Sequence, residues 1–173
     1  MFLSEQGRTD EARAAFDSAM AGGIAQLPPE NGRNTRITVL SSLAITCAFL
    51  DDRTAAPQLY KALHPYAALW NISGWGYLCH TAVTQLLGTL AGVMRECDLA
   101  IQHFETAIQA HDREGAVTAQ GHTLHNYARM LLERNKRGDR AHARQLITRG
   151  LTLATEHGLT SLTDKLTRLG TGG

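Results

Sequence analysis

Two histidines three residues apart, His122 and His125, could begin a metal site. Positions three apart share one face of a helix, and imidazole is a common zinc ligand. Zinc normally takes at least three protein ligands, and no further histidine or glutamate is placed at a matching spacing. We therefore expect exposed histidines rather than a bound metal, and we keep a metal-dependent enzyme built around this pair as the alternative.

Other polar groups do not suggest catalysis. Asp51 and Asp52 are adjacent, so at a helix start they point in different directions, unlike a general acid–base pair. Both are better placed to cap a helix. No Ser/His/Asp or Cys/His nucleophile arrangement can be argued from the spacing. We expect no enzyme activity, no catalytic residue and no cofactor.

Residues 133–144 (ERNKRGDRAHAR) form a basic stretch with five basic and two acidic side chains. Phosphate backbones bind to such patches, but basic residues also suit helix ends and solvated loops. The stretch has no aromatic residues for stacking on bases. Direct nucleic-acid binding is therefore not favoured.

The composition predicts a folded chain without a membrane segment. Of its 173 residues, 43% are hydrophobic and 19% are charged, and the net charge is +1. No run approaches the roughly 20 apolar residues of a membrane span, and the first eight residues lack the apolar core of a signal peptide. The three cysteines are far apart, which suits reduced thiols. We expect a cytoplasmic protein that binds no membrane.

A pattern of small and bulky residues recurs four times with a period of 43 or 44 residues. It consists of a small residue, a bulky residue four positions later and usually a small residue three further on, which share one face of a helix. The copies are Ala12/Phe16/Ala19, Ala56/Tyr60/Leu63, Ala100/Phe104/Ala107 and Ala143/Ile147/Gly150. Such a period is typical of a helical-repeat array. Strands among these helices, or unrelated surroundings for the four bulky residues, would contradict this interpretation.

The elements follow from this register. We expect one all-α domain with a half repeat at 1–22, helix pairs at about 33–64, 77–114 and 117–157, and a closing helix at about 160–169. The connection 65–76 carries Trp70 and Trp75, which we expect to cover the gap between two pairs; exposed tryptophans that anchor a partner are the alternative.

Caps and helix crossings repeat in the same register. Asp10, Thr54 and Asp98 are 44 residues apart and are expected to cap helices, which would place Pro57 in a first turn. The first helix of each pair also has a small residue where it should cross the second helix. These residues are Ala44, Gly88 and Ala128. Glycine in a helix costs about 1 kcal/mol relative to alanine, so Gly88 implies close packing.

The pattern of a small residue, twelve positions, then A-x-x-x-[FY]-x-x-A resembles the tetratricopeptide repeat. The segments DDRTAAPQLYKALHPYA, LLGTLAGVMRECDLAIQHFETAIQAHDREGA and YARMLLERNKRGDRAHARQLITRGLTLATEHGL resemble the C-terminal repeats of large bacterial signalling ATPases. Those proteins join a P-loop ATPase to a LuxR-type DNA-binding domain or an adenylate/guanylate cyclase domain. This chain has no G-x-x-x-x-G-K-[ST], so the ATPase activity is not carried over. The initial half repeat predicts a fragment of a longer protein.

The resemblance implies an inner groove lined by the first helix of each pair. Its candidate residues are Thr38, Ser41, Ile45, Ala82, Gln85, Thr89, His122, His125, Arg129 and Glu133. Polar residues there suit a peptide groove, and they also suit any solvated helix face.

The expected function is a non-catalytic protein-interaction and regulatory module that resembles the sensor tail of an ATPase-type transcriptional regulator. The implied partners are a protein, an upstream ATPase or effector domain, or a small-molecule inducer. Binding would shift the curvature of the array and so the docking of the upstream domain. A stand-alone adaptor that uses the groove around His122 and His125 is a further alternative.

Overall fold

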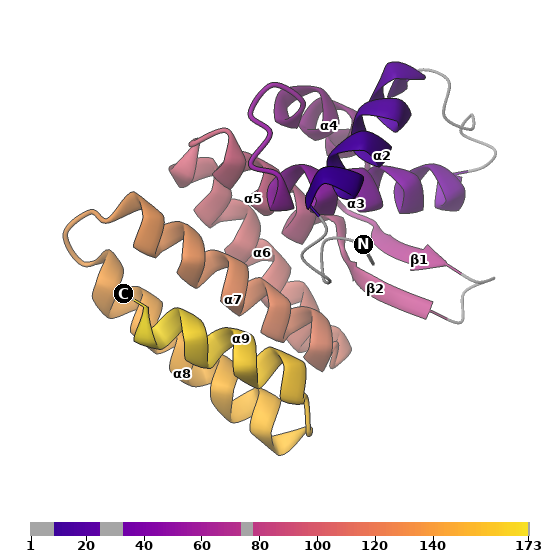
Figure 1. Cartoon of the computed structure of the whole chain (residues 1–173). Coiled ribbons are helices and arrows are strands. Elements are labelled where there is room, and N and C mark those ends of the chain that lie inside the picture. Colours follow the sequence, from indigo (N-terminus) through magenta and orange to yellow (C-terminus); the bar gives the residue numbers. More distant parts are fainter. Residues whose placement is uncertain (1–8, 25–32, 74–77, 173) are drawn as a thin grey trace.

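The structure is a computed structural model that describes residues 9–24, 33–73 and 78–172. The described chain is mostly helical, as expected (Figure 1). The helices are α2 (Thr9–Ala21), α3 (Arg33–Phe49), α4 (Ala56–Leu63), the 3-10 turn η3 (His64–Tyr66), α5 (Val83–Val93), α6 (Cys97–Glu114), α7 (Val117–Arg134), α8 (Asp139–Glu156) and α9 (Thr160–Thr171). Expectations for residues 1–8, for the proline-containing loop at 25–32 and for Trp75 lie outside the described residues.

A β-hairpin between α4 and α5 was not expected. Strands β1 (Trp70–Ser73) and β2 (Leu78–Ala82) pair antiparallel, with an irregularity between Asn71 and Ile72. The expected helix from Tyr77 to Met94 is therefore wrong at its beginning, because α5 starts only at Val83. The preceding residues are held extended by the ladder to β1. The hairpin also interrupts the run of helices between Tyr60 and Phe104, contrary to the expectation that no strand would lie there.

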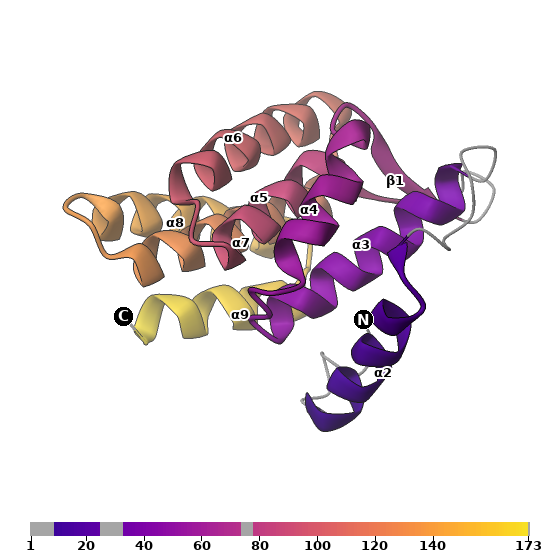
Figure 2. The same cartoon turned by 90° about the horizontal axis from the view of Figure 1, so that it is seen from above.

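Neighbouring helices pack in a regular order. Helix α3 contacts α4 and α5, α5 contacts α6 and α7, and α7 contacts α8 and α9. The odd-numbered helices α3, α5, α7 and α9 thus contact one another in sequence. Figures 1 and 2 both place α2 and α8 at opposite ends of the molecule. At the end near α8, the closing helix α9 buries Leu162 and Leu166 and leaves most of its polar residues exposed.

The residues of the recurring pattern are mostly buried, which confirms the predicted packing face. Among the bulky residues, Phe16, Phe104 and Ile147 are at most 7% exposed, whereas Tyr60 is half-buried. Ala19 is exposed, so the third position of the first copy was predicted wrongly. The core has two clusters, one around α3, α4 and α5 and one around α6, α7, α8 and α9, and Tyr60 packs against both.

Two glycines, one on α7 and one on α8, allow leucine side chains of α9 to pack directly against the backbone of these helices. A Cβ atom at Gly150 would lie 2.9 Å from Leu166, and one at Gly121 would collide with Leu162. Among the residues predicted at helix crossings, Ala44 and Ala128 are fully buried.

The caps predicted at Asp10, Thr54 and Asp98 were wrong, whereas Asp52, also predicted to cap, does accept backbone N–H groups. Helix α4 begins at Ala56 with no capping bond from a side chain, while Asp52 Oδ1 accepts the N–H groups of Thr54 (3.1 Å) and Ala55 (3.0 Å). Asp52, and not Thr54, is thus the side chain that accepts backbone N–H groups before α4, because its short carboxylate reaches two and three residues ahead. Asp10 and Asp98 lie inside the first turns of α2 and α6, where their charge favours the helix dipole. Pro57 does lie in the first turn of α4, as predicted.

Candidate binding cleft

A cleft of about 260 Å³ opens where the ends of α3, α5 and α7 meet. Its wall combines apolar and charged side chains from these helices, from α6 and from the turns that follow α3 and α5. The lining residues are Ala48, Phe49, Asp51, Thr89, Gly92, Val93, Arg95, Phe104, Asn126, Arg129, Met130 and Glu133. Phe49 is 38% exposed and is the most exposed large hydrophobic residue of the described chain.

The structure brings three of the predicted groove residues to this cleft: Thr89, Arg129 and Glu133. The others serve the fold or lie elsewhere. Ser41 is buried and its hydroxyl donates to Ile37 O (2.6 Å). Thr38 Oγ1 donates to Asn71 Oδ1 (3.2 Å) and so joins α3 to β1.

Three more residues predicted to line the groove instead make contacts within the fold. Gln85 is buried, and its Oε1 accepts a hydrogen bond from Thr81. Ala82 is the buried last residue of β2, so its placement on a helix was wrong. Ile45 packs against the core of the α3–α5 half.

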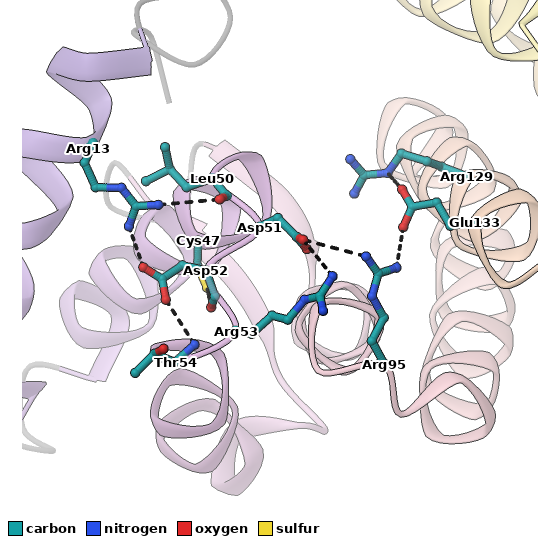
Figure 3. A network of polar contacts seen from close by, with 10 residues as sticks. All are labelled: Arg13, Cys47, Leu50, Asp51, Asp52, Arg53, Thr54, Arg95, Arg129 and Glu133. Carbon is teal, nitrogen blue, oxygen red and sulfur yellow. Dashed lines mark hydrogen bonds and ion pairs between the residues drawn. The ribbon is translucent and has the colours of Figure 1, made fainter.

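A chain of ion pairs runs along the rim of the cleft (Figure 3). Glu133 Oε2 lies 2.8 Å from Arg95 Nη1, and Arg95 Nη2 lies 3.6 Å from Asp51 Oδ2. Arg53 Nη2 is 3.1 Å from the same oxygen of Asp51, and Arg129 Nε is 3.8 Å from Glu133 Oε1. All these side chains are about half exposed, so each pair contributes little to stability. This series of ion pairs instead connects the turn after α3 and the turn after α5 to helix α7.

The two turns at the rim share a backbone feature that spacing alone did not reveal. Asp51 and Arg95 both have positive φ, +47° and +65°, and they are 44 residues apart. Residues other than glycine rarely adopt this left-handed conformation. In each turn the following N–H bonds back to a helix carbonyl at 3.0 Å, from Asp52 to Cys47 and from Glu96 to Ala91. The same local geometry thus presents one charged side chain at the rim from each turn.

Arg129 is the rim arginine whose closest carboxylate is farthest away, with Glu133 Oε1 at 3.8 Å. Its Nε is buried, and among the described groups no acceptor lies within hydrogen-bond distance. Arg95, by contrast, has Glu133 at 2.8 Å. Asn126 lies one helical turn earlier, and its Nδ2 donates a long bond of 3.5 Å to Thr89 Oγ1.

Neither histidine of the pair is among the residues that line the cleft. Both are half-buried on α7, and His125 Nδ1 donates to Asn126 Oδ1 (3.2 Å). Burial lowers the pKa of His125, and this hydrogen bond opposes that effect. Within residues 9–24, 33–73 and 78–172, no group of three or more His, Cys, Asp or Glu side chains is arranged to hold a metal ion.

No family model, curated protein or solved structure matches this chain. In the part of the chain that the structure describes, no helix has the length and apolar character needed to cross a bilayer.

Sequence reasoning missed a buried histidine, His111, which fixes the hairpin to α6 and α7. Its Nε2 accepts the N–H of Ala82 (3.2 Å), so the proton is on Nδ1, which lies 3.3 Å from Thr123 Oγ1. Burial lowers the pKa of His111 to about 4, and the nearby Asp112 opposes this. A signal was present, because His111 lies four residues after Ala107 on the packing face of α6.

Trp70 packs against this histidine, with ring centroids 5.4 Å apart in an edge-on arrangement. It therefore lies at the junction between the hairpin and α6. The basic stretch at 133–144 is partly engaged within the fold, because Arg134 bonds to Asp139 (2.7 Å and 2.9 Å) and Arg140 bonds to Asn135 (3.1 Å).

Proposed function

We propose that this chain is a non-catalytic, tetratricopeptide-like repeat module that regulates a partner by docking it on the face formed by α3, α5 and α7. The cleft carries this proposal, because its lining comes from three successive helix pairs. A partner seated there would contact all three pairs at once. The affinity for the partner would therefore depend on how the pairs are placed relative to one another. A module that regulates through a change in the curvature of its array requires this dependence.

Two observations support a repeat array despite the hairpin. The small and bulky positions of the recurring pattern are mostly buried, and the turns at Asp51 and Arg95 repeat one backbone geometry 44 residues apart. In a solenoid each unit contacts its neighbours, and equivalent turns lie along one edge. Here that edge carries the charged rim of the cleft.

We propose an upstream P-loop ATPase as the docked partner, on the strength of the resemblance to the repeat regions of signalling ATPases. The rim offers charges of both signs: Asp51, Arg95, Arg129 and Glu133. Alternating charges give orientation and selectivity more than affinity. The effector domain in such a protein would be a DNA-binding or cyclase domain.

The genomic reading frame upstream of Met1 provides the first test. A continuous frame that encodes a G-x-x-x-x-G-K-[ST] ATPase supports the proposal, whereas a stop codon and promoter favour the stand-alone adaptor. With the ATPase in hand, its turnover should change when Arg95→Glu is introduced into the repeat module, because the rim then gains repulsive charge. A turnover equal to that of the unmodified protein would contradict docking at this face.

A further inference from the structure

We propose that the cleft between α3, α5 and α7 binds a small organic carboxylate with a short branched apolar body, held by the guanidinium of Arg129. This ligand would act as the effector in the proposed function, but its binding does not require the partner domain. Three features of the cleft support this ligand: the pairing of the charged groups at its rim, its apolar wall and its size.

Each rim carboxylate already has a close cation. Glu133 lies 2.8 Å from Arg95, and Asp51 lies 3.1 Å from Arg53. Arg129 differs, because its nearest carboxylate oxygen is 3.8 Å from Nε and that nitrogen makes no hydrogen bond to the described groups. A buried donor without an acceptor is costly. Arg129 lines the cleft and its side chain is 41% exposed, so its guanidinium can meet an acceptor there, and arginine matches a carboxylate with two parallel bonds.

The rest of the wall selects the body of the ligand. Val93, Phe104 and Met130 provide apolar contact on the α5, α6 and α7 sides, and Phe49 covers the α3 side. Asn126 and Thr89 also line the cleft and can orient a second polar group. A volume of about 260 Å³ is below the 300–1,000 Å³ of sites for drug-sized ligands. This size favours a compact acid over an extended peptide.

Isovalerate is a suitable probe, with isovaleramide as its uncharged match. Proton–nitrogen NMR spectra of the full chain follow the Nε–H signal of Arg129 and the backbone amides of Thr89 and Met130. We expect saturable shifts of all three signals with isovalerate and a Kd of about 1 to 10 mM, as for other ligands of this size. Isovaleramide should cause no saturable shift.

Two matched variants assign the contact. Arg129→Gln should weaken isovalerate binding at least about tenfold, measured at the amides of Thr89 and Met130, because a charge-assisted bond is lost. Arg149→Gln removes an equally exposed arginine on α8 that pairs with Asp112, and it should leave the Kd within about twofold.

Several results would overturn the assignment. They are the absence of a saturable shift, equal shifts with the amide, or equal loss of binding in both arginine variants. If an acetylated Gly-Gly-Val peptide binds through its terminal carboxylate and isovalerate does not, the ligand of the cleft would be the C-terminus of a protein and not a small acid. Failure of the acid to bind leaves partner docking testable by ATPase turnover, so the two proposals fail separately.

Discussion

Gly88 of α5 faces the ring of Phe104 on α6 so closely that a Cβ atom at Gly88 would lie 2.8 Å from Cδ1 of the ring. Phe104 is buried and stacks on Tyr127 of α7, with ring centroids 5.4 Å apart. The ring therefore has little room to move. Glycine at position 88 fixes the distance between α5 and α6 and, through Tyr127, the position of α7 beside the cleft.

Alanine at position 88 should therefore be less favourable than alanine at position 92 of the same helix. A Cβ atom at Gly92 would lie 3.5 Å from Met130, an ordinary contact. Both variants gain helix propensity, but only Gly88→Ala is overpacked. We expect Gly88→Ala to have a free energy of unfolding about 1 to 3 kcal/mol below that of Gly92→Ala, by urea denaturation. Equal stabilities would contradict the close approach.

Asp52, rather than Thr54, should be the residue that stabilises the turn before α4. Asp52→Ala leaves the N–H groups of Thr54 and Ala55 without their acceptor and removes the contact with Arg13. We expect a loss of about 1 to 2 kcal/mol in the free energy of unfolding. Thr54→Ala, at an exposed position, should change it by less than about 0.5 kcal/mol. A larger effect at Thr54 would restore the original cap assignment.

Acid should weaken the fold through His111. The pKa of this side chain is lowered to about 4 in the folded state, below the ordinary value of 6.5, because burial disfavours the charged form. The folded state favours the neutral imidazole of His111. The contribution of His111 to the free energy of unfolding is therefore fully present above pH 6.5 and is lost as the pH falls toward 4. The integrated loss is on the order of 3 kcal/mol.

Urea denaturation at a series of pH values checks this expectation. The free energy of unfolding of the unmodified chain should fall between pH 6.5 and pH 4, and His111→Gln should show a shallower fall over the same range. The variant is also expected to be less stable at pH 7, because Ala82 and Thr123 lose their partner. Parallel pH profiles for the two proteins would exclude His111 as the cause.

Arg134 contacts two carboxylates of very different exposure. Removing each of them in turn compares a buried ion pair with an exposed one at the same arginine. Asp139 is 6% exposed and accepts two bonds from Arg134, whereas Asp98 is 85% exposed and lies 3.2 Å from it. Asp139→Ala should cost about 3 kcal/mol, because Arg134 loses its partner in a largely buried site. Asp98→Ala should cost less than about 0.5 kcal/mol. Thermal or urea denaturation measures both.

The same contact gives a pH dependence. The bond from Arg134 lowers the pKa of Asp139 below its ordinary 3.8. The stabilisation is therefore present above pH 3.8 and is lost as the pH falls through the folded pKa of Asp139. This window lies below most of the window for His111, so a titration from pH 7 downward should show the histidine effect first.

The packing register could be predicted from the sequence because it depends on contacts within and between adjacent helices. The spacing of Ala100, Phe104 and Gly88 indicated the face and the crossing point, and all three are where the pattern placed them. The hairpin was missed because Leu78 to Ala82 also fits an apolar helical start, and periodicity cannot separate the two. The deciding contact, between Ala82 and His111, joins residues 29 positions apart.

The candidate site was predictable only in part for the same reason. Thr89, Arg129 and Glu133 were found from the groove that the resemblance implies together with the helical register, since each lies on the first helix of a pair. Asp51 and Arg95 were missed, because their position depends on a left-handed backbone in two turns. Arg95 is not a residue type that usually adopts this conformation, and Asp51, which adopts it occasionally, gives only a weak sequence signal.

Hydrogen–deuterium exchange on this chain, with and without the proposed ATPase partner, tests docking at the α3/α5/α7 face most directly. The account predicts slower exchange at 44–51, 88–95 and 126–134 when the domain is bound, with the exposed sides of α6 and α8 unchanged. Protection confined to α6 and α8, or no change in the three cleft segments, would contradict it.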